Sequence, residues 1–326
     1  MPRPIINNKW YLIGIIVSSI VVGIIAETIV SNFFFKAILS NKEKNVVRLT
    51  VPKPSEIPTI DQTLSHCANE KLYDNLDDAL IEINKVCKLD LSYQQLRAVP
   101  LEITKLANLT ELRLDDNQLT KLPPEIGNLT KLEVLTIRNN KLKTIPREIS
   151  KLKHLQILTL RHNQLTYLPS EIKYLTSLKV LGLRDNQLAS LPSEIGNLQN
   201  LTDLYAGNNQ LTELPNELGS LQNLTVLSIA DNQFTQFPSV ISHLKKLTIL
   251  NIRHNKIMEL PPEIGSVDSL KDLSISDNPI SQLPPEMAQL KNLIKLYITK
   301  TNVTTSERNT LERLLPHLSV SQSDLE

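Results

Sequence analysis

An asparagine returns every 23 residues through most of this chain, and this period constrains the fold more than any other feature. Each of these asparagines follows alternating apolar residues, mostly leucines, as in Leu109-Thr110-Glu111-Leu112-Arg113-Leu114. Each also precedes an apolar residue and a proline, most often a Leu-Pro pair such as Leu122-Pro123. A fixed period of this size indicates a solenoid, in which a repeat buries its apolar face only against its neighbours. The eight asparagines are Asn117, Asn140, Asn163, Asn186, Asn209, Asn232, Asn255 and Asn278.

Each part of the repeat predicts a local structure. Alternating leucines predict a short strand with one buried face. The asparagine amide can satisfy backbone groups at the turn that leaves the strand, so the eight form a predicted ladder. Proline predicts the start of a short helix or 3₁₀ segment, and the glutamate after it suits a helix N-terminus. Glycines such as Gly196 predict the end of that segment.

The motif L-x-x-L-x-L-x-x-N-x-L-x-x-L-P-x-x-I-x-x-L-x-x resembles the leucine-rich repeat family. It is most similar to the 23-residue subtype with the L-P-x-x-I segment, found in bacterial proteins and in intracellular Ras-group proteins. The resemblance implies an α/β solenoid, a horseshoe of about ten coils with a parallel β-sheet on its concave face. We expect it over residues 86–303, with Gln94 and Thr301 replacing asparagine in the two atypical end repeats.

The regions outside the repeats predict an anchor, a linker and two caps. Residues 1–9 form a short basic tail, 10–30 a transmembrane signal-anchor helix and 31–60 a linker. Residues 61–85 are predicted to form a helical cap with Asn75 as N-cap. Residues 304–326 are predicted to form a C-terminal cap, with a helix that Pro316 ends and a loose tail from Ser319.

The cellular location of the repeat domain is predicted from the apolar N-terminal segment. Residues 10–26 are uncharged, and residues 10–30 rise about 31 Å as a helix, sufficient for a bilayer core. A cleaved signal peptide is the alternative, but no A-x-A cleavage pattern follows the apolar run. We expect a single-pass membrane protein with an exported repeat domain. The lysines and the arginine that follow the span leave a cytoplasmic repeat domain open.

The chain has two cysteines, Cys67 and Cys87. Cys87 shares the strand parity of Leu89 and Leu91, so it should point into the core. Two buried thiols are the favoured interpretation, and a disulfide that pins the N-terminal cap is the alternative, which would require export.

Nothing in the chain predicts catalysis. The sequence has no phosphate-binding loop, nucleophile elbow or Cys-x-x-Cys pair. His162 and His254 share a repeat position, but four strands, about 19 Å, separate them, so they cannot share a metal ion. The net charge of +1 gives no electrostatic footprint for nucleic acid. We therefore predict no enzyme activity, cofactor or metal, and no nucleic-acid partner.

The exposed strand positions of adjacent coils predict the binding surface. Aliphatic residues there stand beside a row of arginines, whose mutual repulsion favours an acidic partner that bridges them. We therefore predict binding of a protein or peptide on the concave face. The alternative interpretation is a solvated face, in which Asp185 and Asp116 balance the arginine charge and the valines are simply good strand formers. A structural or adhesive surface protein that binds carbohydrate is the alternative function. The predicted contact residues are Val134, Arg138, Ile157, Arg161, His162, Val180, Arg184 and Tyr205.

Overall fold

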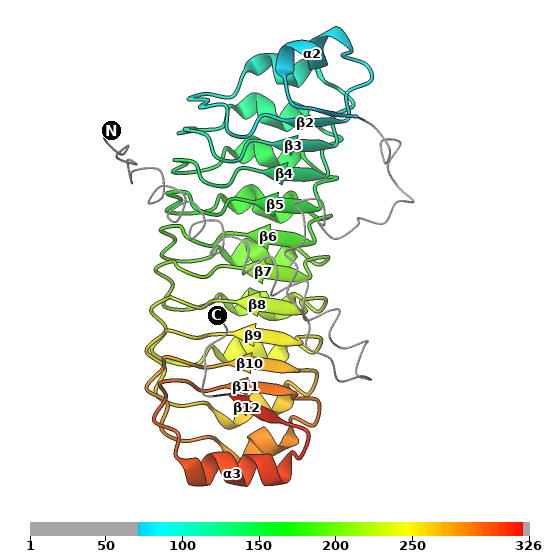
Figure 1. Cartoon of the computed structure of the whole chain (residues 1–326). Coiled ribbons are helices and arrows are strands. Elements are labelled where there is room, and N and C mark those ends of the chain that lie inside the picture. The colour runs from blue at the N-terminus through cyan, green and yellow to red at the C-terminus, as the bar shows by residue number, and fades with distance from the viewer. Residues whose placement is uncertain (1–70, 322–326) are drawn as a thin grey trace, which may run out of the picture. The chain divides into compact units, whose positions relative to one another are not determined.

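The computed structural model describes residues 71–321, which form a stack of coils around one parallel sheet (Figure 1). Twelve strands follow one another in chain order within this range. They are β1 (Leu72–Tyr73), β2 (Lys88–Asp90), β3 (Glu111–Arg113), β4 (Val134–Thr136), β5 (Ile157–Thr159), β6 (Val180–Gly182), β7 (Asp203–Tyr205), β8 (Val226–Ser228), β9 (Ile249–Asn251), β10 (Asp272–Ser274), β11 (Lys295–Tyr297) and β12 (Ser319–Ser321). The predicted parallel-sheet solenoid is confirmed.

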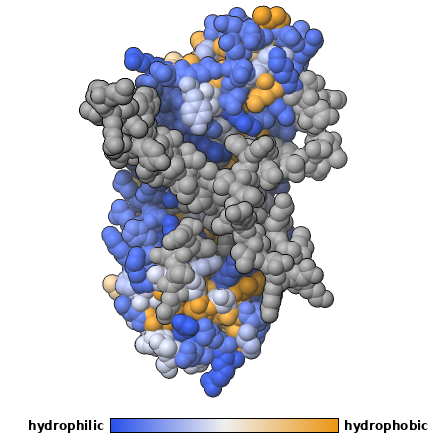
Figure 2. Space-filling model, viewed as in Figure 1, coloured by the Kyte–Doolittle hydropathy of each residue, from blue (hydrophilic) through white to orange (hydrophobic). Residues whose placement is uncertain are grey.

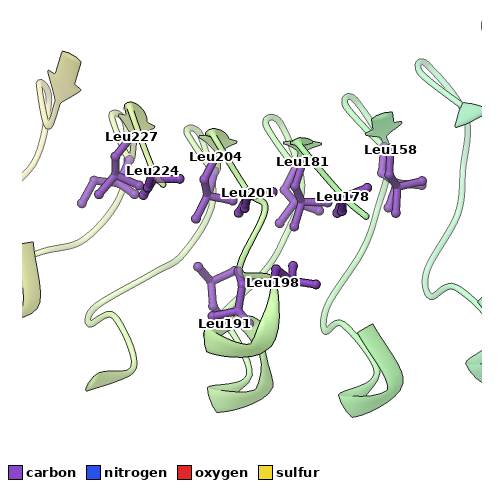
Figure 3. Packing of buried hydrophobic residues seen from close by; sticks show 14 of the residues in the cluster. Leu158, Leu178, Leu181, Leu191, Leu198, Leu201, Leu204, Leu224 and Leu227 are labelled. Carbon is purple, nitrogen blue, oxygen red and sulfur yellow. The ribbon is translucent and has the colours of Figure 1, made fainter. Parts of the chain in front are cut away.

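The 23-residue period places equivalent residues of neighbouring strands side by side. Leu158 of β5 pairs in register with Leu135 on one side and Leu181 on the other. The middle leucines are fully buried and line up beneath the sheet, pointing toward the return segments (Figure 3). Truncating such a leucine to alanine costs about 2–5 kcal/mol, so the core holds adjacent coils together.

The return segments are 3₁₀ helices of five residues, as the Leu-Pro pairs predict. In the coil of Asn186, Pro192 is the N-cap of η5 and Leu198 ends it by donating its N–H to the carbonyl of Ile195. The nine segments are η1 (Leu101–Lys105), η2 (Pro124–Asn128), η3 (Arg147–Lys151), η4 (Ser170–Tyr174), η5 (Ser193–Asn197), η6 (Asn216–Ser220), η7 (Ser239–His243), η8 (Pro262–Ser266) and η9 (Pro285–Gln289).

The glycines of these segments have a different role from the predicted one. Gly196 lies inside η5 rather than after it, and no described glycine has a positive φ. A Cβ atom on Gly196 would lie 2.3 Å from the carbonyl oxygen of Glu217 in the next coil. A Cβ atom on Gly127 or Gly265 would lie 2.5 Å or 2.6 Å from the carbonyl oxygen of Glu148 or Glu286, respectively. In these three coils the absence of a side chain therefore allows the close approach to the next coil, and the prediction that glycine ends the segment is wrong.

The asparagine ladder is confirmed. The side-chain nitrogen of Asn186 donates to the carbonyl of Leu160 at 3.0 Å and to that of Leu183 at 2.9 Å. Its side-chain oxygen accepts from the backbone N–H of Leu165 at 3.0 Å. Asn186 is only 9% exposed. These hydrogen bonds therefore satisfy backbone groups of two coils that water cannot reach.

A second row of asparagines links the coils where each return segment meets the next strand. Asn200 donates from its side chain to the carbonyl of Thr176 at 2.8 Å, and Asn223 donates likewise to that of Gln199 at 2.9 Å. The repeated Asn-Leu-Thr sequence therefore has a structural use at these positions.

The turn after each strand contains a residue with left-handed backbone. The residue before each ladder asparagine has a φ between 50° and 57°, including His162 at 53° and Asp185 at 57°. Asparagine, aspartate and histidine are enriched in this conformation among non-glycine residues. The recurrence of these residue types therefore follows from the backbone of the turn.

The ends of the sheet extend beyond the ten expected strands. Asn75 is the N-cap of α2 (Leu76–Ile81), as predicted, but β1 precedes this helix. Thr304 and Glu307 form a capping box at the start of α3 (Thr305–Leu314), the predicted C-terminal helix. The prediction of a loose tail from Ser319 is wrong at its start, because Ser319–Ser321 pair with β11 as β12.

Two sequence predictions concern the N-terminal region. The predicted anchor, residues 10–30, lies outside the described residues, and no helix within 71–321 has the length and hydropathy to cross a membrane. Cys87 is 6% exposed and disulfide-bonded; the chain's other cysteine is Cys67. The favoured interpretation of two buried thiols is therefore wrong for Cys87.

Candidate binding surface on the sheet

The side chains that flank the middle leucine of each strand form the outer face of the sheet, called here the sheet face. Val134, Ile157 and Val180 hold the same register position on β4, β5 and β6 and form an aliphatic row. Glu111 and Asp203 hold that position on the strands to either side. The row is therefore an apolar strip about three strands wide, bounded by two carboxylates.

Three of the predicted contact residues meet at one carboxylate. Asp185 Oδ2 lies 3.2 Å from Arg161 Nε, 3.1 Å from His162 Nε2 and 3.3 Å from Arg184 Nε. The other oxygen, Oδ1, accepts a hydrogen bond of 2.6 Å from the side-chain amide of Asn208. One negative charge is thus shared by two guanidinium groups and an imidazole, so this cluster retains net positive charge.

Arg138 is held apart from that cluster. Its Nε donates to Thr159 Oγ1 at 3.3 Å, and its backbone N–H donates to Asp115 Oδ1 at 2.6 Å. Asp115 also accepts from the hydroxyl of Thr136 at 3.0 Å. The backbone of Arg138 is therefore fixed while its guanidinium group stays on the sheet face beside the aliphatic row.

Tyr205 lies at the other end of the predicted surface. Its hydroxyl donates to Asp203 Oδ1 at 3.3 Å, and Thr202 donates to Asp203 Oδ2 at 2.6 Å. Four strands, about 19 Å, separate Tyr205 on β7 from Tyr297 on β11. The two rings cannot form one stacking platform, so the sheet face offers little to a carbohydrate.

Burial changes the protonation of several groups on this face. Burial lowers the pKa of His162. The nearby Asp185 carboxylate opposes this shift, and the Arg161 guanidinium reinforces it. Burial likewise raises the pKa values of Asp115 and Asp203, against the hydrogen bonds that favour their ionised forms. The imidazole of His162 is therefore mainly neutral at pH 7, and the arginines supply the positive charge.

The sequence placed the arginines, but it indicated Asp185 only as a nearby balancing charge and not as the residue that contacts three of the predicted side chains. The structure brings Arg161, His162 and Arg184 together on Asp185 and leaves Arg138 and Tyr205 with other partners. Asp185 sits in the left-handed turn position beside Asn186, and its residue type alone did not show which cations it would contact. The available signal was its place one coil after Arg161 and His162.

Sequence profiles of one family match the repeats. The profile "Leucine rich repeat" matches residues 107–165 and 199–257, "Leucine Rich repeats (2 copies)" matches 176–220, and a further "Leucine Rich Repeat" profile matches 269–290. Together with the sheet, the 3₁₀ segments and the asparagine ladder, these matches show that the chain belongs to the leucine-rich repeat family. No curated protein sequence matches the chain.

Solved structures share the fold. The crystal structure of PEPR1–AtPEP1 is 27% identical with a TM-score of 0.60, covering 71% of this chain and 34% of that one. The ectodomain of the receptor kinase GASSHO1/SCHENGEN3 from Arabidopsis thaliana, in complex with CASPARIAN STRIP INTEGRITY FACTOR 2, is 27% identical with a TM-score of 0.52, covering 73% of this chain and 35% of that one. This chain thus spans about a third of either. An internalin (inlF) from Listeria monocytogenes is 22% identical with a TM-score of 0.51, covers 76% of this chain and 84% of that one, and shares the fold alone.

Proposed function

We propose that the chain is a non-catalytic interaction module whose sheet face binds an acidic protein or peptide segment. The single observation that supports it is the cluster at Asp185, where two arginines share one carboxylate beside the aliphatic row. Apolar residues of the partner would cover Ile157 and Val180, beside Val134, which is only 5% exposed. The partner's carboxylates would pair with the arginines. Aliphatic and arginine side chains together have the composition of a protein-binding hot spot.

The fixed orientation of Arg161 favours binding. The hydrogen bond of 3.2 Å from Arg161 Nε to Asp185 Oδ2 orients this guanidinium group, so less of its side-chain entropy is lost when a partner carboxylate arrives. A carboxylate from the partner could also form charge-assisted hydrogen bonds with the guanidinium groups of Arg161 and Arg184. The complexed leucine-rich repeat ectodomain of GASSHO1/SCHENGEN3 is consistent with this proposal, because a protein of the same fold is in complex there.

The proposal is tested by selecting displayed random peptides on the whole chain in detergent micelles. Peptides that combine aspartate or glutamate with leucine, isoleucine or phenylalanine should be enriched on the wild type. Arg161→Glu should abolish the enrichment of acidic residues. Arg147→Glu, which reverses an exposed charge on η3, is the matched control and should retain it. Identical selections on Arg161→Glu and wild type would contradict the proposal.

We propose that the repeat domain is exported and held at a membrane by residues 10–30. The disulfide at Cys87 supports export, because disulfides persist in oxidising compartments and are rare in the cytosol. Protease treatment of intact and lysed cells tests the location. Digestion of the repeats in intact cells, or after opening an outer membrane alone, would support export. Protection until complete lysis would place the repeats in the cytoplasm.

A further inference from the structure

The carboxylate of Asp272 lies on the sheet face without a hydrogen-bond donor. Asp272 begins β10 and is 7% exposed, and its Oδ1 atom is closed to solvent and has no partner. Within residues 71–321, no side chain or backbone N–H donates to either of its oxygens. A buried carboxylate without donors is costly, so a group that supplies a donor would relieve a cost already present in the free protein.

Asp203 shows that a carboxylate at the first position of a strand can have hydrogen-bond donors. It holds the same place on β7 that Asp272 holds on β10, at the start of the strand. However, Thr202 and Tyr205 donate their hydroxyls to the two oxygens of Asp203, at 2.6 Å and 3.3 Å. Of the two aspartates, only Asp272 therefore has a carboxylate oxygen that lacks a donor within the described residues.

The residues around Asp272 form a second apolar surface. Ile249 of β9 is its register partner, and Val226 lies one strand further along the same row. The turn positions that follow these residues carry Ala230 after Val226, Arg253 after Ile249 and Ser276 after Asp272. Arg253 Nη2 lies 4.0 Å from Asp231 Oδ2. Figure 2 shows hydrophobic patches on this face over the C-terminal strands, within a mainly hydrophilic surface.

Two lysines are the charged groups nearest to Asp272. Lys295 is its register partner on β11, and Lys271 precedes it in the chain. Both favour the ionised carboxyl, but burial outweighs them and raises the pKa of Asp272 to about 6. Neither lysine forms an ion pair with it in the described structure. The free carboxylate therefore lacks the close cation that would fully stabilise its charge.

We propose that Val226, Ile249 and Asp272 form a second contact surface, which receives a basic side chain of the partner at Asp272 and an apolar one beside it. This inference rests on the proposed function, because the same partner segment would place its acidic residue at Arg161 and Arg184. Arg184 follows β6 and Asp272 begins β10, four strands apart. The two strands are about 19 Å apart across the sheet, a separation that an extended chain spans in about six residues. The partner is thus a bipolar segment with an acid and a base about six residues apart.

The experiment compares two peptides on the whole chain in detergent micelles. Both are built on the tightest acidic peptide selected on the wild type, and they carry either lysine or uncharged norleucine six residues from the glutamate. The lysine peptide should bind about tenfold tighter or more at pH 7.5, the gain of one charge-assisted hydrogen bond. This advantage should shrink below about pH 6, where the Asp272 carboxyl becomes protonated. Asp272→Asn should remove the advantage, and the matched control Asp203→Asn should keep it.

The outcomes separate this inference from the function on which it rests. Equal affinity of the two peptides for the wild type, with Arg161→Glu still weakening both, would overturn the second surface alone. A lysine advantage that persists in Asp272→Asn would also overturn it, because another group would then receive the lysine. Peptide affinities that do not change in Arg161→Glu would overturn the proposed function and the second surface together.

Discussion

Arg161 Nε lies 3.2 Å from Oδ2 of Asp185, a residue of the following coil. The 23-residue period sets this contact, because it places the turn of one coil beside that of the next. Asp185 Oδ2 also contacts His162 and Arg184. The contact makes Asp185 the residue whose loss should change the cluster most.

Asp185→Asn should lower the pKa of His162 further. Burial already lowers this pKa, and the Asp185 carboxylate partly opposes that effect by favouring the imidazolium. The substitution removes the opposing charge and leaves Arg161 in place. Titration of the His162 ring protons by NMR would measure the shift, with Asp231→Asn as a control in a distant coil. An unchanged or higher pKa of His162 would mean that the carboxylate does not act on the ring.

Asn186→Ala should destabilise the fold by about 1–3 kcal/mol, because it leaves buried backbone groups of two coils without partners. Those groups include the N–H of Leu165 and the carbonyl of Leu160. Denaturant unfolding would measure the loss. Gln187→Ala changes the next, exposed side chain and should stay within about 0.5 kcal/mol of wild type. Equal stability of the two variants would show that the ladder contributes nothing.

Gly196→Ala should destabilise the chain by about 1–3 kcal/mol through overpacking. Its new Cβ would meet the carbonyl oxygen of Glu217 at 2.3 Å, a backbone atom that cannot move without separating the coils. Gly219→Ala is the matched control one coil later, where the nearest atom is Val240 Cγ2 at 3.1 Å. Thermal unfolding should show a clearly larger loss for Gly196→Ala. The reverse order would refute the close-approach explanation.

Asp272→Asn should change how stability depends on pH. The folded-state pKa of about 6 lies above the ordinary aspartate value, so the folded chain binds this proton more tightly than the unfolded chain. Stability from this group is therefore present below about pH 4 and lost as pH rises to about 6. The variant cannot ionise, so its stability relative to wild type should rise across that window and then level off. A variant less stable than wild type at pH 7 would show that the carboxylate has a partner.

The repetitive part of the structure could be predicted because each recurring residue of the repeat favours a particular local structure for a physical reason. Alternating leucines specify a strand, proline fixes the start of the 3₁₀ segment, and Asn186 and its equivalents satisfy the turn. The end strands could not be predicted. Ser319–Ser321 pair with β11, but a strand of three residues with one valine has no visible alternation.

Other features needed three-dimensional contacts. The role of Gly196 depends on the carbonyl of Glu217 in the next coil, which the local sequence around the glycine does not reveal. The arginine row was visible as a repeated position, but its repulsion is partly relieved by Asp185. His162 occupies a turn position that has left-handed backbone in every coil. The backbone conformation therefore explains why histidine is found there, which the sequence alone did not show.

The most direct test of the central claim is methyl NMR of the chain during titration with the selected acidic peptide. The account predicts that methyl signals of Val134, Ile157 and Val180 on the sheet face shift with the peptide concentration. The buried methyls of Ile149 and Ile172, which lie in the 3₁₀ segments η3 and η4, should stay in place. Shifts confined to Ile149 and Ile172, with the sheet-face methyls unchanged, would show that the partner binds elsewhere and would contradict the proposed function.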